Sequence, residues 1–165
     1  MITFLGFDPG QSGGCAMIDQ MGAQAVPMPV AGGAVDAHAL GVWVYSIVMT
    51  ATHAPVIAAV EAVHAMPKQG VSSTFKFGRN YGTILGVLGA LGVRTELVTP
   101  QAWKAVVLAG TTKDKDAAIA WCRRAYPRVE LIQKGCRTPH DGCADALCIA
   151  EWGRRAIGSS AVASR

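Results

Sequence analysis

Residues 2–10 read ITFLGFDPG, and this stretch decides how the chain begins to fold. Its residues are mostly apolar up to Phe7, and the pair Pro9-Gly10 then interrupts the run. An apolar run that stops at such a pair is typical of a buried strand ending in a turn. Asp8 is therefore predicted at the end of an N-terminal strand, where a rigid element carries its carboxylate.

Three further acids fall where the chain can bring them to Asp8. Glu61 ends a second apolar run, 56–60, and Asp141 and Asp145 lie four residues apart in a segment of helical character. Residues four apart share one face of a helix, so both aspartates can point at the ends of the two strands. Carboxylate oxygens suit Mg²⁺ or Mn²⁺. We predict a divalent-metal site, whose two ions, roughly 4 Å apart, would support in-line phosphodiester hydrolysis.

The composition indicates one folded domain. The chain has 165 residues, of which 51% are hydrophobic and 16% charged, which is typical of a globular protein with a sizeable core. No apolar run is long enough for a membrane span, and the N-terminus lacks a basic, cleavable signal pattern. The odd number of cysteines, 5, favours free thiols over a disulfide framework. We expect an intracellular, cytoplasmic protein.

The charge balance is more basic than the net charge of +4 suggests. Four of the 11 acidic residues belong to the predicted site, and two bound divalent cations would offset them, leaving the other acidic residues outnumbered about two to one by the 15 Lys and Arg. A basic surface favours a polyanionic partner such as a nucleic acid. The alternative is that a basic pI only keeps the protein soluble.

The pattern of runs and breakers predicts strands at 1–7, 13–18, 23–29, 55–61 and 93–98. It predicts helices at 35–52, 72–91 and 101–108, another ending at 126, and a last one at 140–157. Ser72 or Ser73 is the expected N-cap of the second helix, and Thr99-Pro100 the start of the third.

This order of elements predicts an α/β fold of the ribonuclease H-like type. A three-stranded meander followed by strands joined through helices gives a mixed five-stranded sheet flanked by helices, with the last helix laid across one face. The chain shows no internal repeat and no linker. We expect a single nuclease domain at 1–158 and a flexible tail at 159–165.

The motifs, taken together in this order, resemble the RuvC-type Holliday junction resolvases, including their phage and organellar relatives. The resemblance rests on GFDPGQSGG, VEAVHAMPKQG, SSTFKFGRNYGTILGVL, TPQAWKAVVLAGTTKDK and HDGCADALCIAEWGRR, and it spans nearly the whole chain. It implies that Asp8, Glu61 and Asp145 bind metal and that Asp141 is the fourth acid. The bacterial enzymes commonly space the last two acids three apart rather than four, so His140 is an alternative ligand, and Asp141 is alternatively an N-cap.

The resemblance also implies how such a protein would work. Its members are symmetric homodimers that bind branched DNA and resolve four-way junctions by paired nicks, leaving 5′ phosphate and 3′ hydroxyl ends. It makes Lys104 and Lys115 candidates for contacting the scissile phosphate, where a lysine offsets developing negative charge. Lys113 lies beside them as a candidate DNA contact. The alternative for these lysines is solvated surface charge.

The segment 72–81 mixes basic and aromatic residues directly after the Glu61 strand. Lys76 and Arg79 can contact phosphates, and Phe75 can stack on an unpaired base or wedge the junction open. The alternative is that Phe75 or Phe77 belongs to the core.

A glycine recurs every fourth residue at Gly78, Gly82 and Gly86. This pattern leaves one stripe of a helix without side chains, and each glycine lowers the stability of the helix by about 1 kcal/mol relative to alanine. The stripe predicts a close approach at a dimer contact or against DNA; the alternative is packing on the protein's own sheet.

Other functions compete with these predictions. Cys136, His140, Cys143 and Cys148 could hold structural zinc, although they lack a paired CxxC unit. The Asp8-Pro9-Gly10 turn also resembles the phosphate loop of actin-like ATPases, but those proteins need two such domains. An RNase H, a general branched-DNA nuclease and a non-catalytic junction-binding protein remain open. Arg154 and Arg155 are interpreted as complements to the dipole of the last helix.

Overall fold

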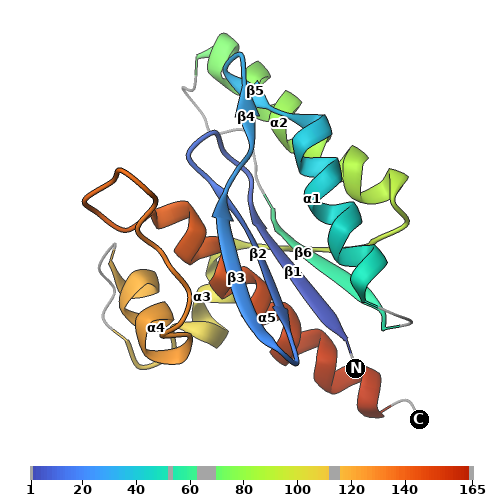
Figure 1. The fold of residues 1–165 in the computed structure, drawn as a ribbon, viewed down its shortest axis with the longest axis vertical. Helices are drawn as coiled ribbons and strands as arrows, with labels where there is room; N and C mark the ends of the chain where they lie inside the picture. Colours follow the sequence, from blue (N-terminus) through green and yellow to red (C-terminus); the bar gives the residue numbers. More distant parts are fainter. Residues whose placement is uncertain (1, 52–53, 63–69, 112–115, 164–165) are drawn as a thin grey trace.

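A mixed five-stranded sheet with the order β3-β2-β1-β6-β7 forms the centre of the fold (Figure 1). The computed structural model describes residues 2–51, 54–62, 70–111 and 116–163. The sheet strands are β1 (Thr3–Asp8), β2 (Gly14–Asp19), β3 (Gly22–Pro27), β6 (Val56–Glu61) and β7 (Arg94–Val98). The helices are α1 (Ala37–Thr50), α2 (Val71–Ala90), α3 (Pro100–Val107), α4 (Ala117–Ala125) and α5 (Asp141–Ala163). The predicted ribonuclease H-like sheet is confirmed.

Strand β2 runs opposite to the other four strands of the sheet, since it pairs antiparallel with both β3 and β1. β1 pairs antiparallel with β2 and parallel with β6, and β6 pairs parallel with β7. In the parallel pair, Phe7 lies opposite Val60. The carboxyl ends of β1 and β6 therefore meet at one edge of the sheet.

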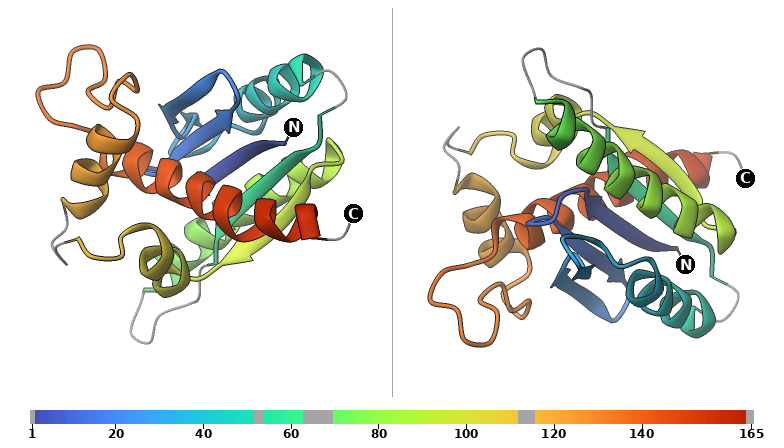
Figure 2. Two further views of the ribbon diagram at one scale, coloured as in Figure 1. Left: turned by 90° about the horizontal axis from the view of Figure 1, so that it is seen from below. Right: turned by 90° about the horizontal axis from the view of Figure 1, so that it is seen from above.

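Helices cover both faces of the sheet and enclose two separate cores (Figure 2). On one face, Leu5, Phe7 and Val60 pack with buried residues of α1 and α2. On the other, Ala16 and Ala59 pack with buried residues of α3, α4 and α5. Alternate residues of a strand point to opposite faces, so this division fixes which face every strand residue occupies.

The long helix α5 crosses the sheet at contact distance because glycines remove the side chains between them. A Cβ on Gly6 would meet the backbone of Ala146 and would lie 2.9 Å from Cα of Ala150. A Cβ on Gly14 would lie 2.5 Å from the carbonyl oxygen of Gly142. Real Cβ atoms do not approach backbone atoms so closely. The position of α5 over β1 and β2 therefore depends on these glycines.

A buried carboxylate joins the three helices on the α5 side. Glu151 of α5 is only 2% exposed and accepts hydrogen bonds from Tyr126 Oη at 2.8 Å and from Nε of Arg154 and of Arg155, each at 2.6 Å. Arg155 also donates to the carbonyl oxygen of Val106 at 3.1 Å, which ties α5 to α3. The two arginines thus neutralise Glu151 rather than complement a helix dipole, contrary to the sequence interpretation.

Several predicted boundaries were wrong. The second helix begins at Val71 after Gly70, which makes no side-chain cap, so neither Ser72 nor Ser73 is its N-cap. The last helix continues to Ala163. The hairpin of β4 (Val30–Ala31) and β5 (Ala34–Val35) was not predicted. The start of α3 is confirmed, because the Thr99 side chain accepts a hydrogen bond from the N–H of Ala102.

Candidate functional site

Asp8 and Glu61 end the two neighbouring parallel strands β1 and β6. Phe7 and Val60 point into the core under α1 and α2, so Asp8 and Glu61 point to the opposite face, toward α5. The pairing of Phe7 with Val60 puts the two acids on adjacent strands, whose spacing is about 4.8 Å. Two acids far apart in sequence thus meet on one face, as predicted.

Asp145 joins this pair from α5. It stands one residue before Ala146, which packs on Gly6, so the close helix–sheet approach brings Asp145 over the ends of β1 and β6. Asp145 interacts electrostatically with both Asp8 and Glu61. Three of the four predicted acids therefore form one group, which we call the acidic cluster: Asp8, Glu61 and Asp145.

The pKa values of two of these acids are strongly raised. Burial, and then repulsion by Asp145 and Glu61, raise the pKa of Asp8 from 3.8 to about 7, against the attraction of Lys104. Burial likewise raises the pKa of Asp145 to about 6; Lys104 opposes the rise, and repulsion by Glu61 and Asp141 adds to it. Like charges held together out of water favour the protonated state. Among the described residues, the attraction of Lys104 does not offset this burial and repulsion.

Helix α3 contributes the cation and an indole. Lys104 is close enough to lower the pKa of both Asp8 and Asp145, and its Nζ lies 5.1 Å from the ring centroid of Trp103. The Nε1 of Trp103 donates a hydrogen bond to Oε1 of Glu61 at 2.8 Å. The structure thus brings the predicted Lys104 to the acids. Trp103 was not predicted as a site residue, because a tryptophan within an apolar helix pattern is normally interpreted as a core residue.

Asp141 stands apart from the cluster. It is the first residue of α5 and is exposed, although its charge still reaches Asp145. The N-cap alternative for Asp141 is wrong, because His140 Nδ1 accepts a hydrogen bond from the N–H of Cys143 at 3.2 Å. His140 thereby uses one ring nitrogen to cap the helix. A cavity of about 490 Å³ beside it is lined by Asp116, Ile119, Ala120, Arg123, Thr138, Pro139 and Asp141.

The acidic cluster fits a hard divalent cation in its chemistry. All of its donors are carboxylate oxygens, the ligands that Mg²⁺ and Mn²⁺ prefer, and their repulsion is the imbalance that a cation would relieve. As their side chains lie, however, no three His, Cys, Asp or Glu residues of the described part of the chain converge on one point at metal-binding distance. The same holds for the zinc alternative, in which Cys136 is exposed while Cys143 and Cys148 are buried.

Neither a protein-family model nor a curated protein matches the sequence. Solved structures do match it. RuvC of Thermus thermophilus in complex with a Holliday junction substrate has a TM-score of 0.65 at 16% identity, with 97% of each chain covered. Another structure of Thermus thermophilus RuvC has a TM-score of 0.59 at 19% identity, covering 94% of this chain and 96% of that chain. The fold is that of RuvC.

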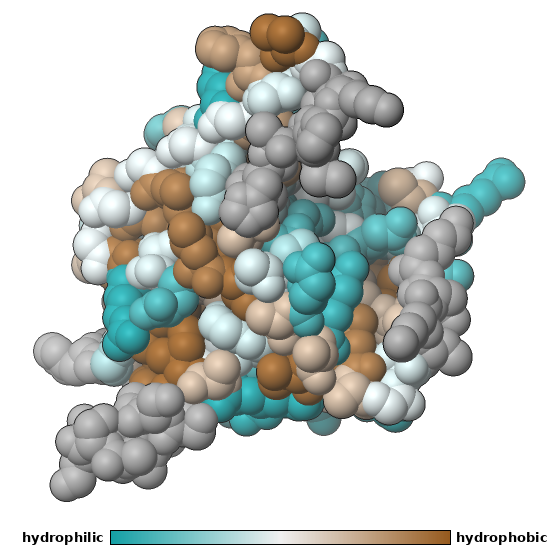
Figure 3. Space-filling model, turned by 180° about the vertical axis from the view of Figure 1, so that it is seen from behind, coloured by the Kyte–Doolittle hydropathy of each residue, from teal (hydrophilic) through white to brown (hydrophobic). Residues whose placement is uncertain are grey.

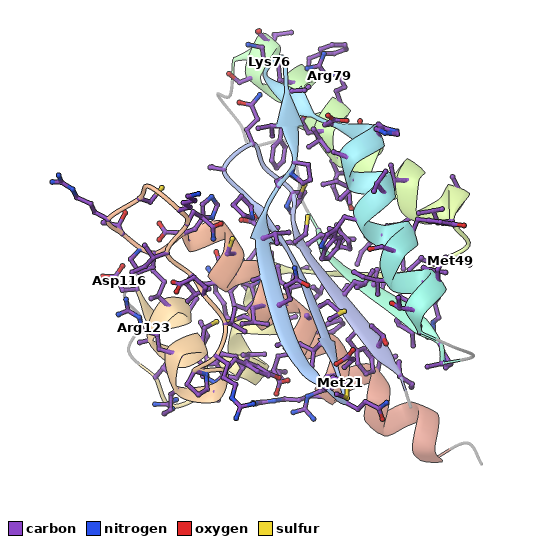
Figure 4. All side chains as sticks on the ribbon, in the orientation of Figure 1. Met21, Met49, Lys76, Arg79, Asp116 and Arg123 are labelled. Atoms are coloured by element: carbon purple, nitrogen blue, oxygen red, sulfur yellow. The ribbon has the colours of Figure 1, made fainter. Side chains whose placement is uncertain are left out.

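Residues predicted to bind DNA lie at the start of α2 in this RuvC-like fold. Lys76 and Arg79 project from the end of the molecule in Figure 4 and form no ion pair with any other described residue. Phe75 is 72% exposed, so its assignment to the core is wrong. Lys113 and Lys115 fall outside the described residues.

A second group of cations was missed from the sequence. Five residues of α4 and the loop before α5 are basic and exposed: Arg123, Arg124, Arg128, Lys134 and Arg137. None of them pairs with an acid elsewhere in the described ranges. Figure 4 shows Arg123 near Asp116, on a different side of the sheet from Lys76. We call this group the α4 basic surface; its signal was the single acid, Glu130, among these five cations.

The glycine stripe of α2 faces away from the protein. A Cβ on Gly78, Gly82 or Gly86 would meet nothing within 4 Å. The alternative that the stripe packs on the protein's own sheet is therefore wrong. Hydrophobic side chains gather on the same side of the molecule, at the left of Figure 3, and α1 exposes Val42 and Tyr45.

Proposed function

We propose that this protein is a metal-dependent, structure-selective endodeoxyribonuclease that resolves four-way DNA junctions by paired nicks. One observation carries the proposal: Asp8, Glu61 and Asp145 meet at the ends of β1, β6 and α5, with Lys104 beside them, in a RuvC-like fold. The matched T. thermophilus protein is described with a Holliday junction substrate.

The chemistry assigns a role to each group. Asp8, Glu61 and Asp145 would hold Mg²⁺ or Mn²⁺, which supplies Lewis-acid stabilisation of the charge that builds up on a phosphodiester under attack by water. Lys104 would offset negative charge on the scissile phosphate. Asp141, exposed at the start of α5, would assist from the edge of the cluster, and Lys115 remains a candidate for a second phosphate contact.

Cations on two sides of the cluster support a DNA partner. Two groups of cations flank the strand ends that carry Asp8 and Glu61 (Figure 4). One is Lys76 and Arg79 at the start of α2, and the other is the α4 basic surface. Lysine and arginine contacts to phosphates position a duplex without reading its sequence. Phe75, which is exposed and precedes Lys76 in α2, would stack on bases that a junction leaves unpaired.

A substrate panel tests the proposal. Labelled four-way junction, replication fork, linear duplex and RNA:DNA hybrid would be incubated side by side with Mg²⁺, Mn²⁺ or EDTA. We expect paired, symmetric cuts in the four-way junction that require the metal. Preferred cutting of the hybrid would indicate an RNase H, equal cutting of all branches a general nuclease, and tight junction binding without cuts a non-catalytic binding protein.

Lys104 and the α4 basic surface should separate catalysis from binding. Lys104→Gln should lower kcat for junction cleavage about 100-fold with little change in junction affinity, because the lysine faces the acids. Lys134→Gln should instead weaken binding and leave kcat at saturating DNA unchanged, because Lys134 lies beside the edge strand β3 rather than at the ends of β1 and β6. Single-turnover cleavage and filter binding would measure both. Equal losses of binding in the two variants would assign Lys104 to docking only.

We also propose that two copies associate through α2. The open glycine stripe lets a second backbone approach, and a dimer would place two acidic clusters on one junction. Gly82→Leu should raise the dimer dissociation constant at least about 10-fold without unfolding the protomer, since its side chain would point into open space. Ala125→Leu, at an exposed site on α4, is the control. Sedimentation would give both constants, and a Gly82→Leu protein as dimeric as the control would exclude this contact.

A further inference from the structure

Trp103 is completely buried, with 0% of its surface exposed. Its one polar side-chain atom, Nε1, finds its partner not in the backbone but in Oε1 of Glu61, at 2.8 Å. The two residues are 42 positions apart in the chain. A buried indole N–H needs an acceptor, and here the acceptor is a member of the acidic cluster.

The same indole also borders the cluster's cation. Nζ of Lys104 lies 5.1 Å from the Trp103 ring centroid, within the range of a cation–π contact. Trp103 therefore contacts both an acid of the cluster and the lysine that the described part of the chain brings to it. Glu61 and Lys104 are held relative to each other through its ring.

Helix α3, which carries Trp103, is fixed at both ends. The Thr99 side chain caps its N-terminus by accepting from the N–H of Ala102. Near its C-terminus, the carbonyl oxygen of Val106 accepts a hydrogen bond from Arg155 of α5. A donor on a rigid element restricts the carboxylate it binds more than a donor on a loop would.

We propose that Trp103 is a positioning residue, which orients the Glu61 carboxylate for metal binding and keeps Lys104 beside it. This inference rests on the proposed function of the site. The indole occupies Oε1 of Glu61, whereas Oε2 has no hydrogen-bond partner among the described residues. The hydrogen bond restricts the rotation of the carboxylate and would leave Oε2 to bind a metal ion. Hydrogen-bonding partners of this kind typically contribute a factor of 10–100 to metal affinity or activity.

The test removes the N–H and keeps the ring. Trp103→Phe and a variant with 3-benzothienylalanine at position 103, in which sulfur replaces the N–H within the same bicyclic shape, would be compared with Trp121→Phe. Trp121 is similarly buried, at 6% exposure, but packs against Tyr126 and Arg155. Free Mn²⁺ would be titrated by electron paramagnetic resonance without DNA, and kcat and KM for junction cleavage would be measured in parallel.

We expect Mn²⁺ affinity about 10-fold weaker or more in both position-103 variants, a fall in kcat with KM for DNA unchanged, and no change in Trp121→Phe. In a Glu61→Gln background, Trp103→Phe should cause no further loss of Mn²⁺ affinity. A folded benzothienylalanine variant with the Mn²⁺ affinity and kcat of the wild type would overturn the inference, even if Trp103→Phe failed to fold. Failure of the proposed function is a separate result: the wild-type protein itself would cut no junction.

Discussion

Asp8→Asn should abolish junction cleavage, with a loss on the order of 10³-fold or more, and should leave junction binding intact or tighter. The substitution removes one carboxylate charge from a cluster in which Asp8, Glu61 and Asp145 already repel one another. It leaves the cations of α2 and of the α4 basic surface untouched. Cleavage under single-turnover conditions and binding in Ca²⁺ would be measured on the same preparation.

The same substitution should stabilise the metal-free protein at alkaline pH. The pKa of Asp8 is raised to about 7 and that of Asp145 to about 6, so the folded protein keeps protons between about pH 4 and pH 7 that the unfolded chain has released. The stability of the wild type in EDTA must therefore fall as the pH rises through this window. Each unit of pKa shift corresponds to about 1.4 kcal/mol.

Thermal unfolding in EDTA at pH 5 and pH 8 would measure this effect. We expect the wild-type Tm to be at least about 5 °C lower at pH 8 from these two groups, and Asp8→Asn to remove more than half of the difference. Mg²⁺ should restore the wild type at pH 8 and have less effect on the variant. Asp19→Asn, at an exposed turn, is the matched control.

For the cleavage prediction, an Asp8→Asn protein that cleaves at the wild-type rate in Mg²⁺ would remove Asp8 from the catalytic role.

Gly6→Ala should have the largest effect on folding of any single-methyl change in the sheet. The added Cβ would meet the backbone of Ala146 and lie 2.9 Å from Cα of Ala150, so α5 has to move away from β1. No side chain can rotate to relieve this contact, because its atoms belong to a helix backbone. We expect a loss of about 3 kcal/mol or more in the free energy of unfolding. The displacement also moves Asp145 from Asp8, so the folded fraction should cleave slowly.

Gly41→Ala is the matched control for this change. Gly41 lies inside α1, and a Cβ there would meet nothing within 4 Å. Alanine is the better helix former by about 1 kcal/mol, so the control should be slightly more stable than the wild type. Urea unfolding of the two variants would compare the signs of their changes in the free energy of unfolding directly. If Gly6→Ala unfolded at the same urea concentration as Gly41→Ala, the close approach of α5 would not be required for the fold.

Local pattern in the sequence predicted the elements on which the site is built. Apolar runs ended by Asp8 and by Glu61 predicted two strands and the acids at their ends, and the acid at Asp145 followed from helical spacing. The five-stranded sheet follows from the order of these elements. Such inferences succeed because strand and helix periodicity is set by neighbouring residues, and because parallel strands bring their carboxyl ends to one edge.

The described helices include none long and apolar enough to cross a bilayer, which agrees with the hydropathy of the sequence. Boundaries were predicted less well. The N-cap of α2 is Gly70 and that of α5 is His140, whereas the sequence favoured Ser72 or Ser73 and allowed Asp141. Several neighbouring polar residues can cap a helix, and the packing of the whole helix selects among them.

Only the tertiary structure decided which residues touch. The regular stripe of Gly78, Gly82 and Gly86 predicted a close approach, yet it lies open within the protomer, whereas Gly6 and Gly142, isolated in the sequence, are where two backbones meet. Trp103 read as core, and only its hydrogen bond to Glu61 ties it to the site. Sequence determines what each segment forms because those preferences are local. Which atoms meet across the chain depends on how the helices pack on the sheet, and no local pattern encodes that packing.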